Sequence, residues 1–194
     1  MITRREFVVG VTCCAACTSV AEKLAGQDVG NSGNEKLVSP CGLYCGACPM
    51  YLATQENNEE RMSSRFGAKA NSKQPSLENM RCDGCLGGGP TPAHVPKCAI
   101  KLCAAEKTKT GRCSECAEFP CGRISDFNND GVQHHSEVLA NLRQLRTMGI
   151  TDWTKFEENR WTCSKCQTKF AWYDAECMTC KTPRSDKLFP LKNA

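Results

Sequence analysis

With 194 residues, the chain has room for one domain with an appendage or for two small domains. Its net charge of +4 is too small to indicate a nucleic-acid partner, and an aromatic content of 7% argues against a large apolar core. The chain has 17 cysteines instead, so we expect cross-links through sulfur, covalent or metal-mediated, to hold the fold together.

Residues 1–21 resemble a twin-arginine export signal. Arg4 and Arg5 precede an uncharged stretch that is too short to span a membrane as a helix and that ends in small residues suited to cleavage. This pattern predicts periplasmic or other extracytoplasmic localisation through twin-arginine export, with a cytoplasmic chain as the alternative. A lipid anchor at Cys17 is a further alternative, and a membrane is expected as a partner only in that case.

Residues 22–38 are rich in Gly, Asn, Asp and Ser and predict a linker. The segment CGLYCGACP at 41–49 follows and carries three thiols, at Cys41, Cys45 and Cys48. Spacings of three and then two residues let three thiolates converge on one face of an ion or cluster, and the glycines let the backbone come close. Radical-SAM enzymes use this spacing too, but the rest of the chain lacks the alternating strands and helices of their barrel.

Seven further cysteines follow before a predicted helix at 122–127. They are Cys82, Cys85, Cys98, Cys103, Cys113, Cys116 and Cys121. Two residues separate Cys82 from Cys85, and two separate Cys113 from Cys116, which is the spacing of a metal knuckle. Cys98 and Cys103 lie on a predicted short helix, five residues apart, and therefore do not share one helix face. Cys121 precedes its helix and is a candidate ligand.

The ten cysteines of residues 39–127 are predicted to bind zinc or an iron–sulfur cluster. The predicted cofactor site contains Cys41, Cys45, Cys48 and Cys121, an arrangement of three close cysteines and one distant one that is known from iron–sulfur proteins. The predicted second centre contains Cys82, Cys85, Cys113 and Cys116. Cys98 and Cys103 remain as spare or bridging metal ligands. In an oxidising compartment, the alternative is a disulfide scaffold.

This pattern resembles a known family. CGLYCGACPMYLAT, CDGC at 82–85, the pair Cys98 and Cys103, and GRCSECAEFPC at 111–121 are together similar to the domain of unknown function 3795, a family of small cysteine-rich bacterial and archaeal proteins. The resemblance covers residues 39–127. It implies metal binding and no particular activity, and in longer family members a helical segment precedes a zinc ribbon.

Two helices are expected in residues 128–160. The first has apolar residues at helical spacing, namely Val138, Leu139, Leu142, Leu145 and Met148, and Gly149 stops it. The second presents Trp153, Phe156 and Trp161. His134 and His135 are expected on the surface rather than at a metal.

Residues 161–183 contain two further knuckles separated by ten residues, and a tail follows at 184–194. The knuckle cysteines are Cys163, Cys166, Cys177 and Cys180. Four thiolates within one short segment are typical of a zinc ribbon, with zinc expected and iron as the alternative.

Taken together, the sequence predicts a small metal-stabilised α+β fold. It comprises an irregular cysteine-rich core with short helices, two packing helices and a C-terminal zinc-ribbon β-hairpin. We expect an exported, non-enzymatic metal-binding protein that serves as an interaction module for an unidentified protein partner. The alternative is an iron–sulfur electron-transfer protein with a redox partner. Catalysis is not expected, because neither His94 nor another histidine lies within a cysteine motif.

Overall fold

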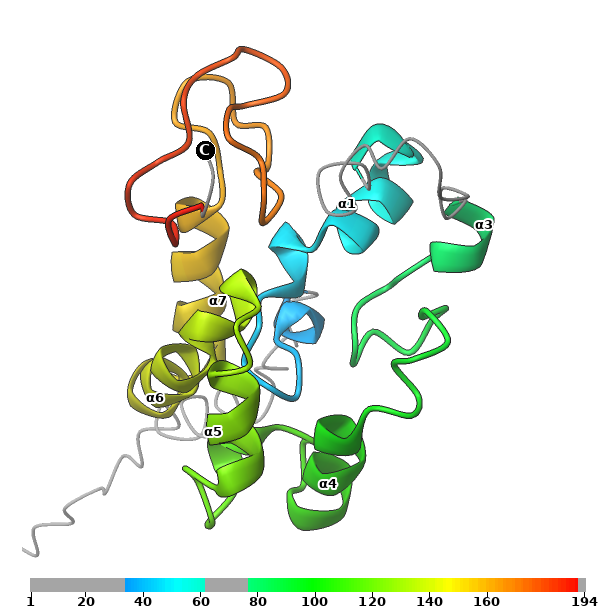
Figure 1. Cartoon of the computed structure of the whole chain (residues 1–194), viewed down its shortest axis with the longest axis vertical. Coiled ribbons are helices and arrows are strands. Elements are labelled where there is room, and N and C mark those ends of the chain that lie inside the picture. The colour runs from blue at the N-terminus through cyan, green and yellow to red at the C-terminus, as the bar shows by residue number, and fades with distance from the viewer. Residues whose placement is uncertain (1–33, 62–76, 192–194) are drawn as a thin grey trace, which may run out of the picture. The chain divides into compact units, whose positions relative to one another are not determined.

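The computed structural model describes residues 34–61 and 77–191 (Figure 1). Its helices in chain order are η1 (Glu35–Leu37), η2 (Cys45–Ala47), α1 (Pro49–Glu56), α3 (Leu77–Met80), α4 (Ala99–Lys107), η3 (Cys113–Glu115), α5 (Gly122–Asn128), η4 (Gln133–Glu137), α6 (Val138–Met148) and α7 (Ile150–Arg160), the η elements being 3-10 helices. The expected export signal, the lipid-anchor cysteine and most of the linker lie outside the described residues. No helix in the described part is long and apolar enough to cross a membrane.

The expected α+β class is wrong, because the described residues contain no strand. The hairpin expected at 161–183 is absent, and two isolated bridges pair single residues there: Thr162 with Lys169, and Glu176 with Pro183. A longer ladder does not form because the intervening amides bond elsewhere. The Trp172 N–H donates to the Ala47 carbonyl at 3.0 Å, and the Ala171 N–H donates to the Asp174 carboxylate at 2.7 Å. The bonds that would continue a ladder are therefore used in a tertiary contact and a tight turn.

The two helices expected in residues 128–160 form as α6 and α7. Val138, Leu142 and Leu145 lie on the buried side of α6, and Gly149, with φ of +77°, separates the two helices. In α7 the buried side carries Trp153, which is fully enclosed. The predicted role of Phe156 is wrong, since 43% of its surface is exposed.

Helix α1 begins directly after the first cysteine motif and is eight residues long. Pro49 occupies its first turn, where a missing N–H costs nothing. The helix ends at Glu56 because Asn57 adopts the left-handed conformation, with φ of +49°, and closes the last turn.

One core joins the cysteine-rich segment to the C-terminal segment. Tyr44 packs edge-on against Trp153, with ring centroids 6.2 Å apart, and the Asn141 side chain donates to the Gly42 carbonyl at 3.0 Å. Five residues beyond the end of α1, the buried Arg61 forms an ion pair with Glu56 and another with Asp174. The segments that carry the cysteines are therefore fixed by the same packing.

Candidate metal centres

Four cysteines of the C-terminal segment form the tightest cluster. The sulfurs of Cys163, Cys166, Cys177 and Cys180 all lie within 4.8 Å of one another. The Sγ–Sγ distance is 3.6 Å between Cys163 and Cys180 and 3.5 Å between Cys166 and Cys177. Four sulfurs around a tetrahedral ion, with metal–sulfur bonds of about 2.3 Å, lie about 3.8 Å apart. The predicted convergence of these four residues is confirmed, and the C-terminal centre they form can hold one metal ion.

Two turns of the same design build the C-terminal centre. In the first, CSKCQT, the Cys163 N–H donates to the Thr168 carbonyl and the Gln167 N–H donates to the Cys163 carbonyl. The second, CMTCKT, repeats both bonds with Cys177, Lys181 and Thr182. Gln167 and Lys181 follow the second cysteine of each turn and have φ of +64° and +56°. The repeated sequence thus gives two matching knuckles that face each other.

Hydrogen bonds within each turn favour the charged form of two thiols. The Thr182 hydroxyl and amide, both bonded to Cys180, lower the pKa of that thiol to about 6. Hydrogen bonds with Thr168 likewise lower the pKa of Cys166, whereas burial raises the pKa of Cys177. Thiolates are the form that binds metal, so the site has ligand charge available at neutral pH before an ion arrives.

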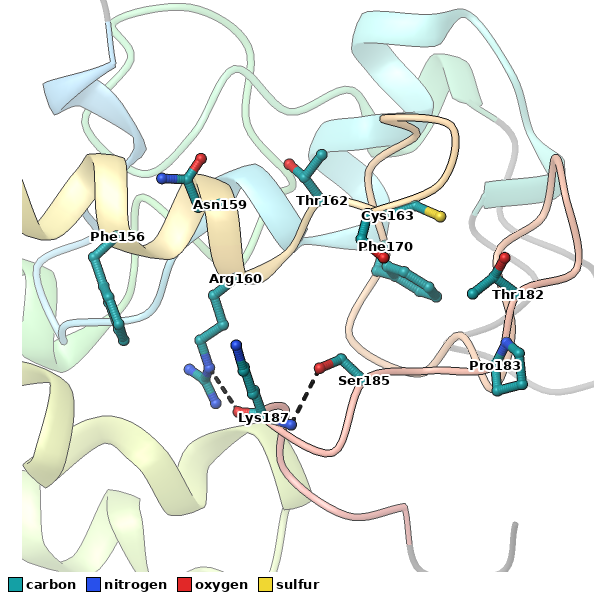
Figure 2. Close-up of a pocket in the computed structure, with 11 residues that line it drawn as sticks. Phe156, Asn159, Arg160, Thr162, Cys163, Phe170, Thr182, Pro183, Ser185 and Lys187 are labelled. Atoms are coloured by element: carbon teal, nitrogen blue, oxygen red, sulfur yellow. Dashed lines mark hydrogen bonds between the residues drawn. The ribbon is translucent and has the colours of Figure 1, made fainter.

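The groove beside the C-terminal centre is shown in Figure 2. It has a volume of about 700 Å³ and lies between α7 and residues 182–187, with Cys163 in its wall. The Arg160 guanidinium donates to the Lys187 carbonyl at 2.9 Å. The same guanidinium forms ion pairs with Glu137 and Glu157. The charge of Arg160 is therefore already balanced.

A second group of cysteines surrounds a cavity of about 270 Å³. The cysteines that line it are Cys41, Cys45, Cys48, Cys82, Cys85 and Cys98. They come from the loop around η2, from the turn before α4 and from the residue that precedes α4. Apolar side chains such as Met50, Ile100 and Trp172 complete the wall, and Lys101 contributes a positive charge. We call this space the six-cysteine cavity.

Glycines let the backbone approach closely around the six-cysteine cavity. Gly84 has φ of +90° and packs against the loop of η2, where an added Cβ would lie 3.3 Å from the Lys36 carbonyl oxygen and 3.8 Å from Cys45 Cβ. Gly42 has φ of +84° and faces Leu142 of α6. Both conformations are ones that residues with a side chain rarely adopt. Gly84 thus lets the two cysteine-bearing loops approach each other, and Gly42 lets the first of them approach α6.

Burial makes most thiols of the six-cysteine cavity reluctant to ionise by themselves. It raises the pKa of Cys41 and of Cys82 to about 12. Cys45 donates a hydrogen bond to Cys85, which raises the pKa of Cys45 and lowers that of Cys85 to about 7. Several buried thiols that face one space become stable thiolates only with a cation to neutralise them. The donor set therefore fits a metal ion or an iron–sulfur cluster.

The other four core cysteines line a different and smaller cavity. They are Cys103, Cys113, Cys116 and Cys121. The structure thus places Cys121 apart from Cys41, Cys45 and Cys48, and places Cys82 and Cys85 on a different cavity from Cys113 and Cys116. Cys98, which precedes α4, and Cys103, in the middle of α4, contribute to different cavities.

The prediction that His134 lies on the surface is wrong. The residue is 4% exposed, and its ring stacks on Trp172 at a centroid distance of 3.9 Å. Its Nδ1 is 2.5 Å from the Tyr173 hydroxyl, and both His134 and His135 line the six-cysteine cavity. In the sequence, the aromatic residues at 170–173 indicate that a side chain elsewhere in the chain packs against them, and His134 is that side chain. His94 also lines the cavity, from an exposed position.

Comparison with known proteins gives one match. Residues 37–126 match the family model described as "Protein of unknown function (DUF3795)". The matched segment contains all the cysteines of the six-cysteine cavity and of the smaller cavity, and excludes the C-terminal centre. No curated protein and no solved structure matches the chain.

Proposed function

We propose that this chain is an exported, non-enzymatic metal-binding protein whose folded surface serves as an interaction module for a protein partner. The observation that carries the proposal is the convergence of Cys163, Cys166, Cys177 and Cys180 within 4.8 Å. Four protein thiolates fill a tetrahedral shell, so no position is left open for a substrate. Such closed sites stabilise a fold rather than catalyse a reaction.

Zinc is the ion we propose for the C-terminal centre. Zinc has no geometric preference from its d electrons and accepts four thiolates in a tetrahedral array. In small peptides such sites contribute roughly 10–16 kcal/mol of apparent binding free energy at pH 7, which is also folding free energy. A chain with few aromatics and no sheet in its described residues would gain most of its local order at 161–183 from this ion.

The test is metal analysis of the full chain, purified without oxygen. We expect the Cys166→Ser variant to lose about one zinc ion per chain relative to the wild type, because three thiolates and a hydroxyl hold zinc far less tightly. The matched control is Ser164→Ala, which alters an exposed residue in the same turn and should retain the full zinc content. Equal zinc content in both variants would contradict the proposed site.

Export is the second part of the proposal and rests on the sequence of residues 1–21. Replacing Arg4 and Arg5 together by lysine should leave the chain in the cytoplasm of a bacterial host that has a twin-arginine pathway. Cell fractionation measures the result. Export by this route would be refuted if the wild-type chain stayed in the cytoplasm of that host, or if the variant were still exported. Attachment of a lipid at Cys17 would show a membrane-anchored form.

Electron transfer through an iron–sulfur centre is the second candidate. The observation that favours it is the six-cysteine cavity, which is larger than one ion needs and offers more thiols than one tetrahedral ion can use. When bound, such a cluster would supply one-electron redox chemistry. Iron with acid-labile sulfide, and a visible absorption that bleaches on reduction, would support this candidate; a colourless zinc-only protein would end it.

A further inference from the structure

The smaller cavity brings together four cysteines that are spread over 19 residues of sequence. Cys103 comes from the middle of α4, Cys113 and Cys116 begin and follow η3, and Cys121 precedes α5. Ile100, Ala104 and Ile124 form the apolar side of the space. The four residues therefore line one cavity although they come from three separate elements.

The size of this cavity suits a single ion. Its volume is about 20 Å³, against about 270 Å³ for the six-cysteine cavity. A space of about 10–15 Å³ on this measure already admits one water-sized body. A single ion has room in this cavity. It would draw the four sulfurs closer together, because among the described residues only the C-terminal centre brings three or more ligand atoms within 4.8 Å of one another.

The thiol of Cys113 lies near the other three thiols of the smaller cavity and near Cys41. Burial raises the pKa of Cys113 to about 12, and the negative charges of neighbouring thiolates raise it further. Those neighbours are Cys41, Cys121, Cys116 and Cys103. Because Cys41 lines the six-cysteine cavity, its effect on Cys113 shows that the two cavities adjoin. Cys121, Cys116 and Cys103 line the smaller cavity together with Cys113.

Contacts around the smaller cavity hold its elements in place. On one side, Lys107 of α4 forms an ion pair with Glu118 at 2.6 Å. On the other side, the Arg146 guanidinium of α6 lies 4.7 Å from the centre of the Phe119 ring and donates to the Cys116 carbonyl. The Arg112 N–H donates to the Thr108 hydroxyl at 3.0 Å, which ties the start of η3 to the end of α4.

We propose that Cys103, Cys113, Cys116 and Cys121 bind one thiophilic divalent ion, zinc or ferrous iron, in a site separate from the C-terminal centre and from the six-cysteine cavity. This site accounts for the ten core cysteines as a group of four and a group of six, with no thiol left over. It is additional to the C-terminal centre of the proposed function and does not depend on it.

The test uses the full chain, purified without oxygen, and the variant Cys116→Ser. Iodoacetamide labelling with peptide mass mapping reports on each cysteine, and metal analysis counts the ions. We expect the variant to lose one divalent ion. Labelling of Cys103, Cys113 and Cys121 should rise by about tenfold or more, because a free thiolate reacts and a metal-bound one is protected. Metal analysis of the wild type distinguishes zinc from iron.

The control is Ser114→Ala, in the same turn, which should keep both its metal and its pattern of protection. Exposure of Cys82 and Cys85 in place of Cys103 and Cys121 would overturn the proposal, since it would show that Cys116 shares its ion with the other pair. Unchanged metal content in Cys116→Ser would overturn it as well. Failure of the C-terminal centre has a different signature, namely a wild-type chain whose Cys163 is unprotected.

Should Cys116→Ser not fold, staged removal of metal from the wild type with a chelator decides the question. Cysteines that share an ion become reactive in one kinetic phase. The four proposed ligands are expected to react together, in a phase distinct from that of Cys163, Cys166, Cys177 and Cys180. Separate phases for Cys103 and Cys121 would overturn the proposal.

Discussion

Replacement of Gly42 by alanine tests how the first cysteine motif is seated on α6. Gly42 has φ of +84°, and a Cβ there would lie 2.7 Å from Cγ of Leu142, which is fully buried. The left-handed conformation costs a residue with a side chain roughly 1–2 kcal/mol, and overpacking adds about 1–3 kcal/mol. Gly42→Ala should therefore lower the free energy of unfolding by about 2–5 kcal/mol.

Gly88→Ala is the matched control, because Gly88 has a similar φ of +78° but no atom within 4 Å of an added Cβ. It should pay only the conformational cost of about 1–2 kcal/mol. The difference of about 1–3 kcal/mol corresponds to about 2–12 °C in Tm for a chain of this size. Thermal unfolding must compare the variants at equal metal loading, since bound metal raises Tm. An equal fall in Tm for both variants would refute the contact between Gly42 and Leu142.

Two further predictions concern an ion pair to the C-terminal segment and a thiol within it. Arg61→Ala should lower the free energy of unfolding by about 3–5 kcal/mol, because it leaves Asp174 and Glu56 without their buried cation. The control is Lys155→Ala, at an exposed ion pair, which should change the free energy of unfolding by less than about 1 kcal/mol. Similar effects of the two variants in urea unfolding would contradict this. In the metal-free chain, the rate of alkylation of Cys180 should rise with pH around a midpoint near pH 6. Thr182→Val should raise that midpoint toward the ordinary value of 9.0, because the hydroxyl that stabilises the thiolate is gone. An unchanged midpoint would show that the Thr182 hydroxyl does not set the pKa of Cys180.

Local patterns in the sequence predicted the parts of the molecule that depend on local contacts. The spacing around Cys163 and Cys177 was enough to predict the C-terminal centre, because each turn is closed by bonds within six residues. Helices α6 and α7 followed from apolar periodicity and from Gly149. These features need no information about distant parts of the chain.

Features that depend on distant contacts could not be predicted in the same way. The absence of a C-terminal hairpin results from the bond between Trp172 and Ala47, which are 125 residues apart. The burial of His134 results from Trp172 and Tyr173, which cover it from a later segment. The distribution of the ten core cysteines over two cavities depends on how α4 is oriented, since that orientation directs Cys98 and Cys103 to different sides.

The same distant contacts join the C-terminal centre to the six-cysteine cavity. Trp172 lies in the cavity wall and, through its backbone, bonds to Ala47 in the loop that carries Cys45 and Cys48. Trp172 also lies in the segment between the two knuckles, so an ion bound by the knuckles would restrain this wall. Loss of metal from the C-terminal centre should therefore loosen the six-cysteine cavity, and Cys166→Ser should speed the release of whatever metal the cavity binds. A chelator time course on Cys166→Ser and Ser164→Ala measures this, and equal rates of release would show that the two centres are independent.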